Sequence, residues 1–136
     1  NPGAIDLERE IRRFGEKITS GAEFFFSQPV YRPDLLDGFL KATDAFPRVP
    51  FFVGILPLAS LRNAEFLHNE VPGMQIPEEI LKRMRAAESK EEQQREGIRI
   101  AQEMLREVVK NPRVKGIYLF PPFGRYESVL EVLEAL

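Results

Sequence analysis

The stretch AEFFFSQP, at residues 22–29, decides the fold, because three successive phenylalanines closed by a proline are typical of a short buried β-strand. Two similar runs follow it along the chain, VPFFVGIL at residues 49–56 and VKGIYLF at residues 114–120. Each run is too short for a helix and is continuously apolar rather than alternating. We therefore expect three strands that are buried on both faces.

The segments between these runs have the apolar spacing of amphipathic helices. The first helix is predicted at residues 6–19, where Leu7, Ile11, Phe14 and Ile18 form one stripe and Ser20-Gly21 provides the stop. The charged residues 88–94 are expected to be a solvated break or an exposed turn. The other helices are predicted from Pro33 to about Phe46, at about 60–68, from Pro77, over about 98–109 and at 126–136.

Strands that alternate with helices run parallel, with helical crossovers, so the predicted class is α/β. Three parallel strands alone leave both edges and much apolar surface uncovered. Each strand–helix unit is also about as long as those of an eight-fold barrel of ~250 residues. Residues 1–4 resemble a loop from a strand to a helix. We therefore predict that residues 1–136 are a partial barrel domain, the C-terminal portion of a (β/α)8 TIM barrel.

Composition excludes several classes of function. Lys and Arg number 19 against 21 Asp and Glu, for a net charge of −2, which offers no basic field to a nucleic acid. No run approaches the roughly 18 apolar residues of a membrane span. The absence of cysteine excludes disulfides, thiolate metal sites and a cysteine nucleophile, and it is compatible with a reducing, cytoplasmic location.

In parallel α/β folds, ligands bind at the carboxyl ends of the strands. This rule selects residues 27–31, 54–63 and 121–125. The carboxamide of Gln28 is either a capped surface group or a donor and acceptor directed into the mouth of the barrel, as a heterocycle with lactam-like edges requires. Arg125 either binds a carboxylate or phosphate or caps its own loop.

Three further groups of residues can be explained by their structural roles alone. Asn63 and Leu67 share a helical face, which alone favours a solvated amide and a core leucine. The stripe of Glu10, Arg13 and Lys17 is usually a solvated face, unless its cations meet phosphates. The only histidine, His68, has no second histidine nearby, so no metal site is expected. Residue patterns alone assign no general base and no nucleophile.

The chain resembles the methylenetetrahydrofolate reductase family over nearly its whole length. The resemblance is carried, in order, by four segments: GAEFFFSQPVY (21–31), GILPL (54–58), VPGMQIP (71–77) and PPFGRY (121–126). The amino-acid sequence of residues 54–79 is most similar to the reductase module that some bacteria fuse to a homocysteine S-methyltransferase. The resemblance implies a (β/α)8 flavoenzyme of one-carbon metabolism that uses FAD and NADH or NADPH to reduce 5,10-methylenetetrahydrofolate to 5-methyltetrahydrofolate.

By this resemblance, the chain supplies the helix after strand five and then strands six to eight. The strand-six glutamine that touches both folate and nicotinamide falls on Gln28. The other folate positions fall on Asn63, on Leu67 beside the aminobenzoate ring, and on Arg125, where the loop is one residue longer than in the family. The FAD contacts fall on Glu10, Arg13 and Lys17, of which Lys17 matches best.

The resemblance also implies that the chemistry needs more than this segment. The family's catalytic glutamate, and the histidine and aspartate that approach its flavin, have no counterpart here, so the segment alone is expected to be inactive. Its expected partners are the folate substrate and the remainder of the barrel upstream, and a homo-oligomer is left open. Two alternatives remain: a non-catalytic interaction domain that retains half of the barrel, and a different barrel enzyme that binds another pterin or flavin.

Overall fold

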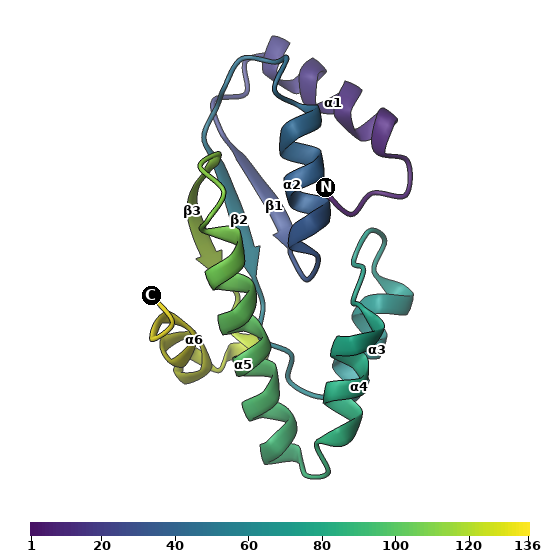
Figure 1. The fold of residues 1–136 in the computed structure, drawn as a ribbon, viewed down its shortest axis with the longest axis vertical. Coiled ribbons are helices and arrows are strands. Elements are labelled where there is room, and N and C mark those ends of the chain that lie inside the picture. The colour runs from purple at the N-terminus through teal and green to yellow at the C-terminus, as the bar shows by residue number, and fades with distance from the viewer.

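The computed structural model describes all of residues 1–136 and has three strands and six α-helices (Figure 1). The elements are α1 (Leu7–Thr19), β1 (Phe25–Pro29), α2 (Pro33–Ala42), β2 (Phe51–Ile55), α3 (Leu61–Glu70), α4 (Glu78–Ala86), α5 (Lys90–Val108), β3 (Val114–Leu119), a 3-10 turn η1 (Pro122–Gly124) and α6 (Tyr126–Leu133).

The strands form one parallel sheet in the order β1-β2-β3, so the predicted α/β class with helical crossovers is confirmed. Phe25 of β1 lies opposite Phe51 of β2, which in turn lies opposite Val114 of β3. The crossover from β1 to β2 is the single helix α2. The crossover from β2 to β3 holds three helices, α3, α4 and α5, of which α3 and α4 form a separate lobe beside the sheet (Figure 1).

Local signals in the sequence begin several of these helices. The side chain of Asp6 accepts a hydrogen bond from the backbone N–H of Arg9 and caps α1, while Pro33 occupies the first turn of α2. Ser60 caps α3 through the N–H of Asn63. These caps satisfy N–H groups that have no partner within the helix, and they place each helix start within one residue of its prediction.

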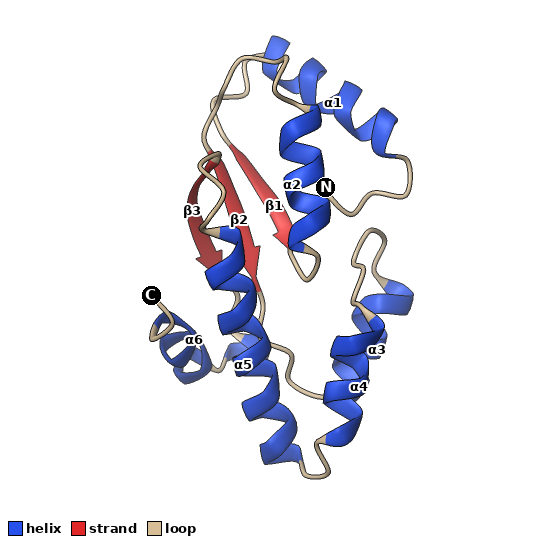
Figure 2. Ribbon diagram, in the orientation of Figure 1, coloured by secondary structure: helices blue, strands red, loops and turns tan.

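Helices cover one face of the sheet only, as α2 and α5 show in Figure 2. On that side, Val53 and Ile55 of β2 are completely or almost completely buried beneath the two helices. On the other side Phe24 and Phe26 are 53% and 58% exposed. The prediction of strands buried on both faces is therefore wrong for β1 and β3, because an apolar run does not reveal what covers its second face. It holds for the central strand β2, of which only Phe52 is not fully buried. The main core contains Phe14, Val30, Leu36, Phe39, Leu40, Phe51, Val53, Ile55, Ile98, Ala101, Leu105, Val108 and Val132.

The expected break at residues 88–94 is also wrong, because α5 begins at Lys90 and includes most of that stretch. Ser89 and Glu92 form a capping box, in which the serine hydroxyl accepts from the N–H of Glu92 and the glutamate accepts from the N–H of Ser89. The polar residues that suggested a break are thus a helix start. The break itself is confined to the short link between α4 and α5.

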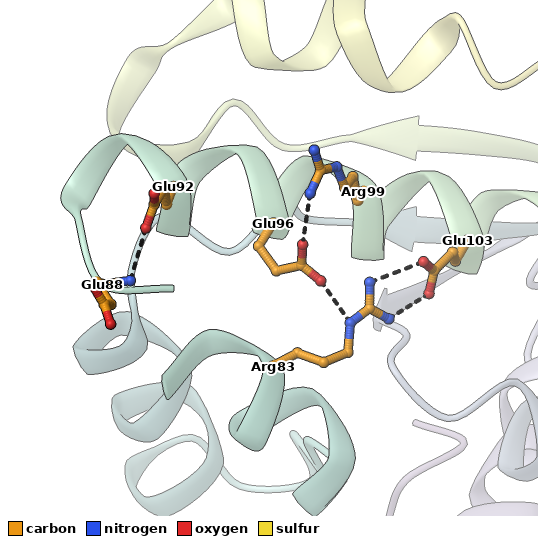
Figure 3. Close-up of polar contacts among 6 residues, drawn as sticks. All are labelled: Arg83, Glu88, Glu92, Glu96, Arg99 and Glu103. Carbon is orange, nitrogen blue, oxygen red and sulfur yellow. Dashed lines mark hydrogen bonds and ion pairs between the residues drawn. The ribbon is translucent and has the colours of Figure 1, made fainter. Parts of the chain in front are cut away.

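An ion-pair cluster fastens α4 to α5 (Figure 3). The guanidinium of Arg83 donates from Nε to Glu96 at 2.6 Å and from two nitrogens to Glu103 at 2.6 and 2.9 Å. Arg99 pairs with Glu96 on the same helix at 3.2 Å. The bidentate hydrogen bonds to Arg83 lower the pKa of Glu103 below its usual range. This cluster therefore attaches the α3–α4 lobe to α5.

Candidate functional site

The carboxyl end of β1 contains an irregularity at the position that the sequence singled out. The pairing of β1 with β2 shifts register between Phe26 and Pro29. There the hydroxyl of Ser27 accepts a hydrogen bond from the N–H of Gly54 at 3.1 Å and donates to the carbonyl of Gln28 at 2.7 Å. A side chain thus replaces a backbone acceptor, as in β-bulges that redirect a neighbouring residue. Ser27 forms the bulge, and the side chain of the adjacent Gln28 is exposed.

Gln28 is exposed, and its carboxamide makes no hydrogen bond within the chain. It borders a hollow of about 20 Å³ between the end of β1, the N-terminal loop and the turn at residues 73–75. That volume holds about one water molecule, so the hollow is no ligand pocket by itself. The structure therefore places Gln28 at the end of β1, with its donor and acceptor both free.

The open face of the sheet is aromatic. Phe26 packs edge-on against Tyr118 at 5.1 Å between ring centroids, and Tyr118 packs against Phe120 at 4.9 Å. The hydroxyl of Tyr118 donates to the carbonyl of Ser27, and partial burial raises the pKa of Tyr118 above its usual value. A side chain at Gly54 would collide with the Tyr118 ring. Glycine in β2 therefore lets the tyrosine tie β3 to the end of β1.

Asn63 and Leu67, one helical turn apart on α3, line a second hollow, which is separate from the one beside Gln28. Phe66 lines it as well, and so does Phe123 from the loop after β3, which brings two strand ends together. Phe123 is 82% exposed, with a φ of 50° that non-glycine residues rarely adopt. Neither phenylalanine was singled out from the sequence, where only Gly124, a residue that tolerates positive φ, hints at such a turn. Three apolar side chains therefore line this hollow together with Ser60, Arg62 and Asn63.

The amide of Asn63 has one end occupied. Its Oδ1 accepts a hydrogen bond from the backbone N–H of Ala59 at 3.2 Å. The backbone N–H of Asn63 donates separately to Ser60 Oγ at 3.1 Å. A backbone N–H can only donate, so the atom facing Ala59 must be the oxygen. The Nδ2 group of Asn63 has no partner within the chain. Asn63 and Leu67 are both half-buried, and Leu67 packs against a second cluster of buried residues that includes Leu58, Ala64 and Ile76. The expectation of a core Leu67 is therefore met in part, and Asn63 is not fully solvated.

Arg125 lies away from the other candidates. It is exposed and borders a separate polar hollow with residues of α5 and α6, among them Glu91, Arg95 and Glu131. It stands at the start of α6, and its side chain does not cap that helix. Arg62, which the sequence did not single out, lines the hollow of Asn63 and forms no ion pair. The structure brings Asn63 and Leu67 together, but places Gln28 and Arg125 in other hollows.

The stripe on α1 carries two free cations. Arg13 and Lys17 are exposed, four residues apart, and form no ion pair at contact distance. Glu10 is half-buried on the same stripe. Neighbouring Arg12 differs, because it pairs with Glu16 along the helix at 3.9 Å. The Arg13–Lys17 edge can therefore meet an anionic group without first breaking a contact.

Two further observations concern metals and membranes. His68 accepts a hydrogen bond from the N–H of Ile76 at 3.2 Å, which gives the only histidine a structural task. No three His, Asp or Glu side chains gather where they could hold a metal ion. None of the helices combines the length and apolar character needed to cross a membrane.

Comparison with known proteins relates the chain to a family and to a solved structure. A family model described as methylenetetrahydrofolate reductase matches residues 1–136. Among solved structures, the chain is similar to an uncharacterized protein from Clostridium thermocellum that binds two copies of 5-methyl-5,6,7,8-tetrahydrofolic acid. The TM-score is 0.66 at 17% identity, and the match covers 94% of this chain and 47% of the other. The chain thus has the fold of about half of that protein.

Proposed function

The chain belongs to the methylenetetrahydrofolate reductase family, and from this premise we propose that it is part of an FAD-dependent oxidoreductase. Its reaction is the reduction of 5,10-methylenetetrahydrofolate to 5-methyltetrahydrofolate by NADH or NADPH. The family match over the full length of the chain carries the proposal. The folate bound by the structurally similar clostridial protein supports it.

In this proposal the chain provides strands six to eight of a (β/α)8 barrel, and α1 is the helix after strand five. The open aromatic face of Phe26, Tyr118 and Phe120 supports this, since it is the side that a closed barrel turns inward. The remaining units come from sequence upstream of Asn1. The proton-transferring carboxylate expected for the family comes from there as well.

The residues present suit a reduced folate. The free donor and acceptor of Gln28 match the polar edge of a pterin, which offers both kinds of group. The apolar side of the Asn63 hollow, with Leu67 and Phe123, suits an aromatic ring. Arg125 is an exposed cation at the same end of the sheet, available to a carboxylate. In this assignment these groups bind and orient the substrate and move no proton.

The residues of α1 fit the phosphates of FAD. Arg13 and Lys17 are unpaired cations on one edge of the helix, and both would hold the diphosphate. Glu10 lies on the same stripe, where its carboxylate can accept from a hydroxyl group. When bound, FAD would relay reducing equivalents from the nicotinamide to the folate. The protein orients the two substrates and excludes water.

The test uses the full-length protein. We expect a bound flavin with a visible spectrum that bleaches anaerobically with NADH or NADPH and recovers when 5,10-methylenetetrahydrofolate is added. A colourless protein that does not take up added FAD would contradict the flavoenzyme assignment. A flavin that bleaches but does not recover with this folate would favour a barrel enzyme for another pterin or flavin substrate.

The second candidate function is a non-catalytic interaction domain, which the exposed rings of Phe24 and Phe26 favour because such a patch often binds a partner. Sedimentation of the isolated 136-residue chain tests this candidate. Under the interaction proposal the isolated chain associates with itself or a partner and needs no flavin. A compact monomer at all concentrations would contradict it.

A further inference from the structure

The first turn of α3 is held by a side chain from a distant part of the sequence. The backbone N–H of Leu61, at the start of α3, donates to Oε1 of Gln93 on α5 at 3.0 Å. This N–H is one of those that a helix cannot satisfy internally. Ser60 satisfies the N–H of Asn63 in the same turn. The start of α3 therefore depends on one local cap and one cap from α5.

The other end of the same carboxamide is also occupied. Nε2 of Gln93 donates to the carbonyl of Ala87, just beyond the end of α4, at 3.2 Å. Gln93 is half-buried, and its two hydrogen bonds join the end of α4 to the beginning of α3. An amide is the side chain suited to this, because it accepts at one atom and donates at the other.

The surroundings fix the position of Gln93 on both sides. One turn along α5, Gly97 lies against the backbone of Leu58, so α5 approaches the β2–α3 loop closely. On the side of α4, Arg83 binds Glu96 and Glu103 of α5 (Figure 3). Gln93 thus extends from a helix that is tied to α4 and packed against the loop before α3.

The direction of the Asn63 amide follows from the same turn. With Oδ1 held by the N–H of Ala59, the amide is oriented so that both N–H groups of Nδ2 stay free. Asn63 therefore offers a ligand an unoccupied donor. We propose that Gln93 is a positioning residue, which fixes the first turn of α3 so that Asn63 presents its amide donor to an acceptor atom of the substrate. This inference rests on the proposed function.

The test measures steady-state kinetics and thermal unfolding of the full-length enzyme. Gln93→Met keeps the length of the side chain and removes both hydrogen bonds. We expect KM for 5,10-methylenetetrahydrofolate to rise about two- to tenfold, the range in which one neutral hydrogen bond contributes. The rate of NAD(P)H oxidation with a quinone as electron acceptor should stay within about twofold, because that assay does not use the folate.

Two variants separate positioning from stability. Gln93→Glu keeps the acceptor for Leu61 and loses the donor to Ala87, so KM for the folate should stay near the wild-type value even if the unfolding temperature falls. Gln102→Met is the matched control, since it removes one hydrogen bond from α5 to the carbonyl of Glu131, away from α3. It should leave KM unchanged.

The outcomes distinguish this inference from the proposed function. If the wild-type enzyme does not turn over the folate, the proposed function fails. If it does, and Gln93→Met has the wild-type KM, the positioning role is overturned. Should Gln93→Met not fold, Asn63→Asp decides, because it keeps the acceptor for Ala59 and removes the free donor. An unchanged folate KM in that variant overturns the inference, and a raised KM supports it.

Discussion

Gly97 of α5 lies so close to the carbonyl oxygen of Leu58 that a β-carbon at position 97 would overlap that oxygen. The contact joins two backbones, and neither can move aside by changing a rotamer. It brings the long helix against the loop that leads from β2 to α3. The absence of a side chain at this one position therefore sets the distance between the sheet and the α3–α4 lobe.

Gly97→Ala should accordingly destabilise the protein. The extra methyl group must displace backbone, which costs about 1–3 kcal/mol or more in the free energy of unfolding. Denaturant unfolding measures the change. Gly38→Ala is the matched control, because a methyl group on the exposed side of α2 meets nothing within 4 Å. That variant should gain about 0.5–1 kcal/mol from helix propensity. Equal effects at the two positions would refute the close contact.

Ser27→Ala should weaken the sheet at the end of β1. The change removes the acceptor for the buried N–H of Gly54, and an unsatisfied buried group costs about 1–3 kcal/mol. The measurement is again denaturant unfolding. Ser20→Ala, at the exposed end of α1, is the control and should change stability by less than about 0.5 kcal/mol. A Ser27→Ala protein as stable as the wild type would show that water replaces the hydroxyl.

The Arg83–Glu103 pair should make stability depend on pH in the acid range. The hydrogen bonds from Arg83 lower the pKa of Glu103 in the folded chain below its usual 4.5. The unfolded state therefore binds more protons there, and stability falls as the pH drops below about 4.5. Both side chains are more than a third exposed, so solvent screens the pair and the slope is shallow.

Glu103→Gln should flatten this slope in unfolding curves measured between neutral and acid pH. The comparison variant is Glu107→Gln, whose carboxylate pairs with Lys110 at 2.6 Å and leaves α4 attached. An identical pH dependence in wild type and Glu103→Gln would mean that the pair adds nothing to folding.

Gln28→Ala should impair folate reduction far more than folding. The carboxamide makes no hydrogen bond within the chain, so its loss removes contacts only to a ligand. In the full-length protein we expect kcat/KM for 5,10-methylenetetrahydrofolate to fall at least about tenfold, with the unfolding temperature nearly unchanged. Full folate-dependent turnover in this variant would show that Gln28 does not bind the substrate.

Lys17→Met should weaken FAD binding, because an unpaired cation on α1 would no longer meet the phosphates. The dissociation of FAD from the full-length protein, followed by fluorescence as salt is raised, measures the effect. Arg12→Met is the control from the same helix, since Arg12 is already paired with Glu16. If both variants lose FAD equally, α1 affects FAD binding only through its net charge, and Lys17 makes no specific contact.

The sequence predicted the order of the elements and the start of every helix except α5, because these signals are local. The cap at Asp6, the proline at position 33 and the three apolar runs each act within a few residues. Two predictions were wrong, for different reasons. What covers Phe26 depends on other segments of the chain, which a local pattern does not reveal. The start of α5 is local, because Ser89 and Glu92 form a capping box, but the charged residues 88–94 were interpreted as a break.

The same distinction between local signals and contacts of distant segments applies to the candidate site. Gln28 could be proposed from the sequence because a strand end is a position along the sequence, whereas the proposal for Asn63 came from the family resemblance. The bulge at Ser27, the cap from Gln93 and the contribution of Phe123 were not found. Each of these joins segments at least 27 residues apart or depends on backbone angles, and no periodicity encodes such a relation.

The exposed aromatic edge of β1 also bears on how the protein is made. Three adjacent phenylalanines with an unpaired strand edge form the kind of segment that seeds cross-β aggregation. Glu23 stands directly before them and Pro29 ends the strand, and a flanking charge and a proline are residues that oppose stacking of identical strands. While a nascent chain still lacks its neighbours, these two residues are its protection against amyloid-like association, and replacing both should reduce the yield of soluble protein before any loss of folded stability is seen.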